Sequence, residues 1–185
     1  MGRPKAWLPF GGETMLARVV RLLGGVVSPL VVVAAPDQEL PPLPSEVILV
    51  RDPERGRGPL VGIAAGLAAL AGKADAAYVS SCDVPLLRPA FVRRMIDLLG
   101  DHAACVPEVG GYYHPLAAVY RVEVAAAAAE LLAADRLRLA FLFERVPTRI
   151  VTAEDFADID PDAESLWNLN TPEEYERVLA LLGFG

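Results

Sequence analysis

The chain has 185 residues, of which 54% are apolar and 22% are charged, and its mean hydropathy is +0.36. This composition excludes a disordered chain, and the length suits one folded domain spanning residues 1–185. Acidic residues outnumber basic ones by 24 to 17, which disfavours a nucleic acid partner, and the longest apolar run, Leu60–Ala71, is shorter than the ~20 residues that cross a bilayer. No export signal precedes the first elements, so we expect a cytoplasmic protein with no membrane association.

The first half of the chain alternates short apolar runs with helical patterns. The runs are apolar on both faces, which is typical of strands covered by helices on both sides. The expected strands are Leu30–Ala35, Val47–Val50 and Ala76–Ser80, and the expected helices are Glu13–Leu23, Pro59–Ala71 and Pro89–Leu99. Such alternation predicts βαβ units and a parallel sheet.

The second half has a different pattern. A turn at Gly110-Gly111 precedes a predicted strand over Tyr113–Arg121 and a predicted helix over Val122–Ala134, which together indicate an antiparallel addition to the sheet. The last helix has the clearest ends, because a capping box at Thr171 marks its start and Gly183 marks its end. We therefore predict an α/β fold with a mostly parallel sheet and an antiparallel addition in the C-terminal half.

Two aspartates directly follow predicted strands, where ligands bind in open α/β sheets. Asp52 follows Val47–Val50 and Asp83 follows Ala76–Ser80, so both are expected at the same edge of the sheet. A pair of carboxylates is a suitable ligand set for Mg²⁺. Each aspartate could equally be an ordinary turn residue or helix cap.

The loop after Asp52 has features of an anion site. It contains Gly56 and Gly58, which let the backbone approach a ligand closely, and Arg55 and Arg57, which suit phosphate oxygens. Glycine pairs are common in loops, so this signal alone is weak.

Four other polar residues have both a structural and a functional interpretation. Lys5 could be a solvated lysine or a phosphate-binding cation, and His114 could be a structural hydrogen bonder. Asn168 and Asn170 could form a turn before the last helix or orient a polar ligand or a metal-bound water.

Taken together and in order, several segments resemble the molybdenum cofactor guanylyltransferase family, which belongs to the nucleotidyltransferases with a Rossmann-like, three-layer fold. The matching segments are Met1-Gly2-Arg3-Pro4-Lys5, Leu8-Pro9-Phe10-Gly11-Gly12, Arg51-Asp52, Gly58-Pro59-Leu60-Val61-Gly62-Ile63, Ser81-Cys82-Asp83-Val84-Pro85-Leu86, His114-Pro115-Leu116 and Asn168-Leu169-Asn170-Thr171-Pro172. The resemblance covers nearly the whole chain.

The resemblance implies a Mg²⁺-dependent transfer of GMP from GTP to the terminal phosphate of molybdopterin, or of its molybdenum-bound form, with release of pyrophosphate. It implies that Lys5 neutralises triphosphate charge and that Asp83, with Asp52, holds Mg²⁺. GTP would be bound by Lys5, Asp52, Gly58 and Asp83. The pterin substrate would be contacted by His114, Asn168 and Asn170, and proteins of molybdoenzyme maturation would be partners.

Two alternative functions remain open at the level of sequence. One is a related nucleotidyltransferase that uses CTP or a sugar phosphate, because metal and triphosphate handling are shared across the group. The other is a non-catalytic adaptor that keeps the nucleotide-binding fold.

One departure from the family concerns the N-terminus. Members of the family begin with a hydrophobic strand and a glycine-rich loop, whereas this sequence starts at the Met-Gly that follows them. We expect the natural protein to extend upstream. Without that strand, two neighbouring strands would keep unpaired backbone groups, and we would expect weak nucleotide binding and low stability.

Overall fold

The largest sheet in the computed structural model, which describes residues 4–52 and 56–184, has five strands. Strand β8 lies between β5 and β6, and β6 also pairs with β7 and with β9. The strands are β5 (Ala76–Ser80), β6 (Ala104–Val109), β7 (Tyr112–Tyr113), β8 (Ala117–Arg121) and β9 (Thr148–Thr152). The β6–β9 pair is parallel, and the other pairs of this sheet are antiparallel.

Two smaller sheets come from the N-terminal third of the chain. Strands β3 (Val31–Ala34) and β4 (Ile48–Arg51) pair in parallel, with Val31 opposite Ile48. Strands β1 (Pro9–Phe10) and β2 (Glu13–Thr14) form a hairpin. Its turn consists of two glycines with positive φ, +58° at Gly11 and +86° at Gly12, a conformation that other residues rarely adopt.

The predicted α/β fold is confirmed, and its strands are more often antiparallel than the sequence pattern suggested. Continuous apolar runs favour strands that are covered on both faces, although Leu49 of β4 is 45% exposed, and they do not show the direction of a strand. Direction here follows from a turn at Gly110 and Gly111, whose φ values of +62° and +82° reverse the chain after β6. The expected strand over Tyr113–Arg121 is divided into β7 and β8 around Pro115, which has no N–H to donate to a ladder.

The α-helices agree closely with the sequence pattern, except for α5 (Leu139–Arg145), which was not predicted. The others are α1 (Met15–Gly24), α2 (Pro59–Ala69), α3 (Pro89–Leu99), α4 (Val124–Ala133) and α6 (Pro172–Leu181), with short 3₁₀ helices η1 (Lys5–Trp7), η2 (Ala153–Phe156) and η3 (Glu164–Leu166). Helix α1 starts two residues later than expected because the Thr14 hydroxyl accepts a hydrogen bond from Ala17 N (3.3 Å) and caps it. None of the helices in the described ranges is long and apolar enough to span a bilayer.

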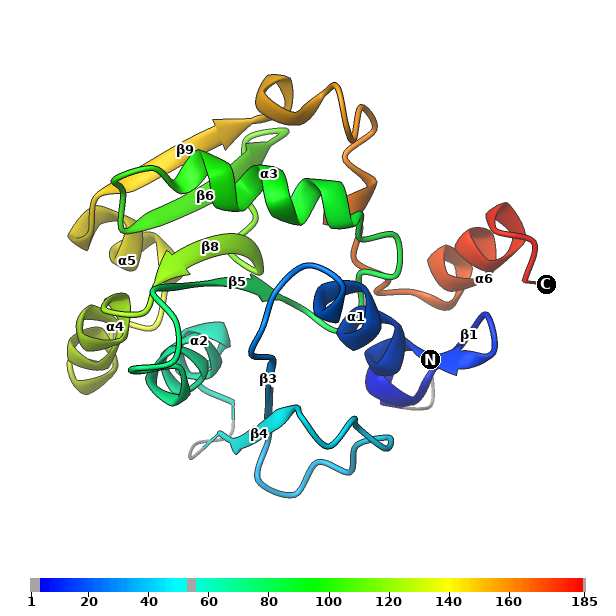
Figure 1. Cartoon of the computed structure of the whole chain (residues 1–185), viewed down its shortest axis with the longest axis horizontal. Coiled ribbons are helices and arrows are strands. Elements are labelled where there is room, and N and C mark those ends of the chain that lie inside the picture. Colours follow the sequence, from blue (N-terminus) through cyan, green and yellow to red (C-terminus); the bar gives the residue numbers. More distant parts are fainter. Residues whose placement is uncertain (1–3, 53–55, 185) are drawn as a thin grey trace.

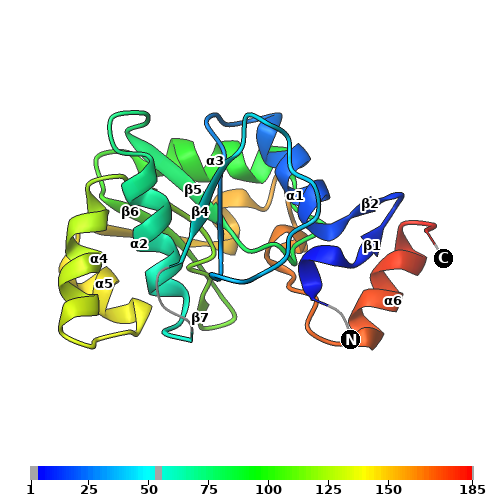
Figure 2. The same ribbon diagram turned by 90° about the horizontal axis from the view of Figure 1, so that it is seen from below.

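Side chains of the large sheet alternate between two apolar layers. On one face, Val119 packs with Phe91 and Met95 of α3, and on the other face Tyr120 packs with Leu60 of α2 and Ala128 of α4. This alternation along β8 is the two-residue period of a strand. Helices therefore cover both faces, and the middle of the molecule has three layers (Figure 1; Figure 2).

A gap in strand pairing separates the two halves of the central layer. Strand β3 pairs with β4 and strand β5 pairs with β8, but β3 and β5 do not pair with each other. Between them lies a cavity of about 440 Å³, lined by apolar residues that include Val33 of β3, Val79 of β5, Leu16 of α1 and Ile63 of α2.

Among the residues that the structure describes, the edges of β3 and β5 at this gap carry backbone groups without a ladder partner. Ile48 N donates to Leu30 O and Asp52 N donates to Ala34 O, so the even-numbered residues of β3 face β4. The N–H groups of Val31 and Val33 therefore point away from β4, toward the cavity.

Candidate functional site

The centre of the candidate site is Asp83, in the loop that follows β5. Its residue exposure is only 8%, although it carries a carboxyl group. The Asp83 carbonyl accepts a hydrogen bond from Leu169 N at 3.0 Å. This bond brings the segment before α6 against the loop after β5, although the two are far apart in sequence.

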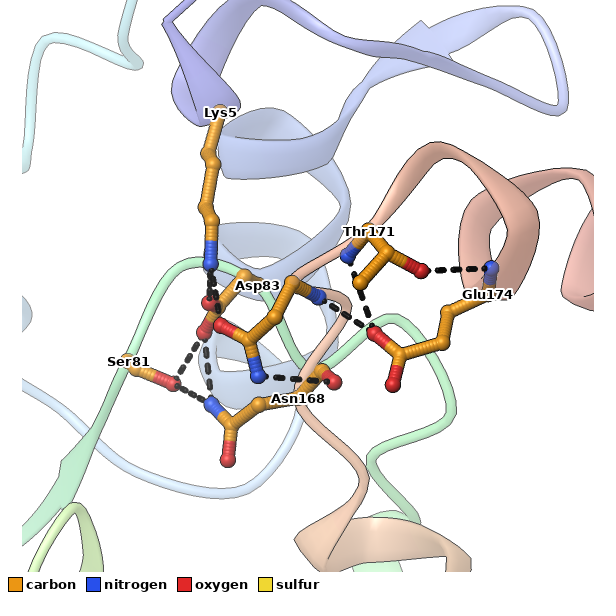
Figure 3. Close-up of polar contacts among 7 residues, drawn as sticks. Lys5, Ser81, Asp83, Asn168, Thr171 and Glu174 are labelled. Carbon is orange, nitrogen blue, oxygen red and sulfur yellow. Dashed lines mark hydrogen bonds and ion pairs between the residues drawn. The ribbon is translucent and has the colours of Figure 1, made fainter. Parts of the chain in front are cut away.

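Three side chains donate hydrogen bonds to the Asp83 carboxylate (Figure 3). Lys5 Nζ approaches Oδ2 at 2.5 Å, while Ser81 Oγ and Asn168 Nδ2 approach Oδ1 at 2.6 Å and 2.7 Å. Both carboxylate oxygens are therefore engaged within the protein.

These contacts set the protonation state of Asp83. Burial raises the pKa of its carboxyl group, but hydrogen bonds from Lys5, Ser81 and Asn168 and the charge of Lys5 outweigh burial. The pKa of Asp83 is therefore held below its ordinary value. A buried aspartate at this position is an anion at neutral pH.

Lys5 reaches the site from η1. Backbone bonds from Trp7 N to Pro4 O (3.0 Å) and from Leu8 N to Lys5 O (3.1 Å) form this single turn. The Lys5 ammonium also donates to Asn170 Oδ1 at 2.8 Å, and the side chain is 34% exposed. The ammonium thus lies between a carboxylate oxygen and an amide oxygen, with access to solvent.

The capping box of α6 positions the asparagine segment. Thr171 Oγ1 accepts a hydrogen bond from Glu174 N (3.2 Å), and Glu174 Oε2 accepts bonds from Thr171 N (3.0 Å) and Asn170 N (2.7 Å). These backbone bonds lower the pKa of Glu174. The predicted cap therefore also orients Asn170 toward Lys5. Figure 3 shows the capping contacts between Thr171 and Glu174.

The structure brings together four of the residues singled out in the sequence: Lys5, Asp83, Asn168 and Asn170. Ser81 lies in a matching segment but was not predicted as a site residue. Its position two residues before Asp83, at the end of a strand, is the signal that could have identified it.

Asp52 and Gly58 lie on other elements. Asp52 follows β4, in the smaller parallel sheet, and its N–H donates to Ala34 O at 2.8 Å. Gly58 precedes α2 with a φ of +82°, so the loop requires a glycine there. Arg57 donates to Leu132 O (2.9 Å) and Asp135 Oδ1 (3.0 Å), which ties this loop to the end of α4, and Arg55 lies outside the described residues.

His114 lies just before β8, at the sheet end that also carries the loop of Asp83. The neighbouring strands meet there through a bond from Ser81 N to Leu116 O at 3.3 Å. Burial lowers the pKa of His114, which favours a neutral imidazole. The side chain is half-buried, and its backbone N–H donates to Pro107 O at 2.8 Å.

The groups at this site that could bind a ligand are oxygen atoms and one ammonium group. Within the described ranges, no three His, Cys, Asp or Glu residues gather as a metal-binding group. Asp83 and Asn170 nevertheless direct oxygens at one cation, the Lys5 ammonium, and such oxygens suit Mg²⁺ when a substrate phosphate and water complete the coordination. The donor set at this site is therefore of the kind that a divalent cation with a bound phosphate prefers.

The fold defines the class of protein. The structure resembles that of molybdopterin-guanine dinucleotide biosynthesis protein A from Archaeoglobus fulgidus, with a TM-score of 0.80 and 19% identity, over 98% of this chain and 92% of that chain. It also resembles 2-C-methyl-D-erythritol 4-phosphate cytidylyltransferase from Thermus thermophilus, with a TM-score of 0.69 and 18% identity, over 96% and 93% of the two chains. The protein has a nucleotidyltransferase fold.

Comparison of the sequence with known proteins identifies the family within this class. The MobA-like NTP transferase domain matches residues 1–148, and the chain belongs to this family of transferases. It is 32% identical to a molybdenum cofactor guanylyltransferase from Desulfosudis oleivorans, over 100% of this chain and 90% of that protein. It is 35% identical to a probable molybdenum cofactor guanylyltransferase from Mycobacterium avium, over 97% of this chain and 88% of the relative.

Proposed function

We propose that this protein is a molybdenum cofactor guanylyltransferase, which transfers GMP from GTP to the terminal phosphate of molybdopterin and releases pyrophosphate. The family and the names of the relatives support this function. The observation that carries it is the convergence of Asp83 Oδ2 and Asn170 Oδ1 on the Lys5 ammonium. This arrangement places two oxygen ligands that suit a divalent cation beside a positive charge that suits a phosphate.

The reaction requires that the phosphate charges be neutralised and that the two phosphate groups be positioned, and it depends less on proton transfer. An oxygen of the pterin phosphate forms a bond to the α-phosphorus of GTP, and the bond from that phosphorus to the bridging oxygen of pyrophosphate breaks. The nucleophile is already an anion, so it needs no general base. Lys5 would offset the negative charge of the triphosphate as the two phosphate groups approach each other.

Asp83 and Asn170 would hold the divalent cation, which we propose is Mg²⁺. Their oxygens match its preferred ligands, and substrate phosphates and water would supply the others. When bound, Mg²⁺ neutralises phosphate charge and polarises the α-phosphate. Ser81 and Asn168 would hold the carboxylate of Asp83 in its orientation.

The remaining candidate residues have proposed roles at the rim of the site. Asp52 and Gly58 would contact GTP, because they directly follow β4 and directly precede α2, and Asp52 would also contribute to metal binding. His114, Asn168 and Asn170 would contact the pterin substrate. Proteins of molybdoenzyme maturation would receive the product.

The test measures pyrophosphate release from GTP by the full chain with Mg²⁺ and molybdopterin, and identifies the dinucleotide product by mass spectrometry. Asp83→Ala should abolish release. Glu130→Ala is the matched control, because Glu130 is an exposed carboxylate that pairs with Arg145 on the surface, and it should keep the wild-type rate. Equal rates for the two variants would show that Asp83 takes no part, and no release by any of the proteins would favour an adaptor.

A second candidate function is a cytidylyltransferase or a sugar-phosphate nucleotidyltransferase. The likeness to the Thermus thermophilus cytidylyltransferase fold is the observation that favours it. Competition between GTP and CTP in the same assay separates the two functions. A clear preference for CTP would replace the guanylyltransferase by this alternative.

A further inference from the structure

The Lys5 ammonium lies between the two oxygens to which the proposed function assigns the divalent cation. It is 2.5 Å from Asp83 Oδ2 and 2.8 Å from Asn170 Oδ1, the two oxygens that can best serve as ligands. The other carboxylate oxygen of Asp83 accepts hydrogen bonds from Ser81 and Asn168. In the free protein, Asp83 is therefore both hydrogen-bonded and neutralised by an internal cation.

An ammonium group and a divalent cation cannot occupy one pair of oxygens together, because they repel each other at such short distances. We propose that Lys5 competes with the divalent cation for Asp83 and Asn170, so that the metal site opens only when a triphosphate draws Lys5 away. This inference rests on the proposed function, since it assumes that a nucleoside triphosphate binds here. It predicts that metal and nucleotide bind cooperatively and that metal alone binds weakly.

The movable member of this pair is Lys5. Asp83 is 8% exposed and held by three hydrogen bonds, whereas the Lys5 side chain is 34% exposed and extends from the single turn of η1. A lysine side chain has a flexible four-carbon stem and a compact charge. Lys5 can therefore reach a neighbouring phosphate without any change in the sheet or in α6.

A triphosphate supplies the driving force for this exchange. Moving Lys5 away leaves Asp83 as a buried anion, which is costly unless another cation arrives. A divalent cation that enters with the triphosphate provides that charge, and the phosphates provide Lys5 with a new anionic partner. The divalent cation and the triphosphate therefore each make binding of the other more favourable. The difference in binding free energy is the coupling free energy between the two sites.

The experiment measures Mn²⁺ binding by the electron paramagnetic resonance signal of the free ion. Wild type, Lys5→Met and Lys73→Met are titrated without nucleotide and then with a non-hydrolysable GTP analogue. Lys73→Met is the matched control, because Lys73 is the only other lysine of the sequence and contacts Ala69 O on the surface. Both variants lose one positive charge, so the overall charge of the protein changes equally.

Without nucleotide, Lys5→Met should bind Mn²⁺ about 5- to 150-fold more tightly than wild type, which is the usual range of coupling between sites. Lys73→Met should bind it like wild type. The GTP analogue should increase the Mn²⁺ affinity of wild type by a larger factor than that of Lys5→Met. Equal nucleotide-free affinities for wild type and Lys5→Met would overturn the inference.

A measurement on wild type covers the case in which Lys5→Met does not fold. With ¹⁵N-labelled lysine the protein has two side-chain ammonium groups, and that of Lys5 should be unaffected by Mg²⁺ alone and shift when Mg²⁺ and the GTP analogue are both present. A shift with Mg²⁺ alone as large as the shift with both ligands would refute the proposal that the metal site opens only with a triphosphate. Failure of this inference and failure of the proposed function can be distinguished. Pyrophosphate release from GTP with uncoupled Mn²⁺ binding refutes only this inference, whereas coupled Mn²⁺ binding with turnover of CTP alone refutes only the guanylyltransferase.

Discussion

Replacing Asp83 with asparagine keeps the shape of the side chain and removes its charge. The carboxylate accepts hydrogen bonds from Lys5, Ser81 and Asn168, at distances of 2.5–2.7 Å. An asparagine has one acceptor oxygen and one donor nitrogen, so its nitrogen must face Lys5 or Asn168, which are themselves donors. At least one hydrogen bond to a charged group is therefore lost.

The expected cost follows from that loss. A hydrogen bond to a charged group contributes about 1.5–3 kcal/mol when buried, and Asp83 is 8% exposed. In a chain of this size, each kcal/mol lowers Tm by about 2–4 °C, so Asp83→Asn should lower Tm by about 3–12 °C. Calorimetry and urea unfolding at pH 7 measure this change.

The effect should also depend on pH. The pKa of Asp83 is lowered in the folded protein, so its ionised form stabilises the fold above the unfolded pKa of about 3.9, and this contribution is lost as the pH falls through the folded value. The difference in stability between wild type and Asp83→Asn should therefore shrink in acid. A difference that stays constant between neutral and strongly acidic pH would contradict the proposed ion pair.

A control separates this effect from a general loss of charge. Asp158 pairs with Arg94 (2.7 Å) on the surface and its side chain is 63% exposed, so Asp158→Asn should shift Tm much less than Asp83→Asn. Equal shifts for the two variants would refute the view that the hydrogen bonds of Asp83 stabilise the fold.

Three further predictions concern other parts of the structure. Thr171→Ala removes the N-cap of α6 and should cost about 1 kcal/mol in urea unfolding; a loss near zero would mean that the last helix contributes little to folding. Because burial lowers the pKa of His114, the unfolded chain binds more protons than the folded chain just below pH 6.5, and the free energy of unfolding should fall there as the pH is lowered. His114→Asn should not show this fall. A fall of the same size in the variant would assign it to another group. The amides of Val31 and Val33 should exchange with deuterium faster than that of Val32, which faces β4, and equal protection of all three would contradict the open edge of β3.

Sequence reasoning identified several members of the candidate site but not their contacts. Asp83 was predicted because it follows a buried strand, and Asn170 because it precedes a capped helix. Nothing in the sequence showed that Lys5 would contact both of them, because 78 and 165 residues separate it from these partners. The importance of Ser81 also depends on its orientation toward Asp83 Oδ1, which no local pattern specifies.

The sequence by itself determined the positions of several helices and strands. Some helices and strands are defined by interactions between near neighbours in the chain, and their signals are visible in the sequence. These signals are the capping box at Thr171, the prolines that begin α2, α3 and α6, and the apolar runs of β3 and β5. The tertiary structure alone decided that β5 pairs antiparallel with β8, that a cavity lies between β3 and β5, and that Lys5 meets Asp83 and Asn170. Those features depend on contacts between segments distant in sequence, whose free energy comes from burial and charge pairing in the folded chain and leaves no periodic pattern in the sequence.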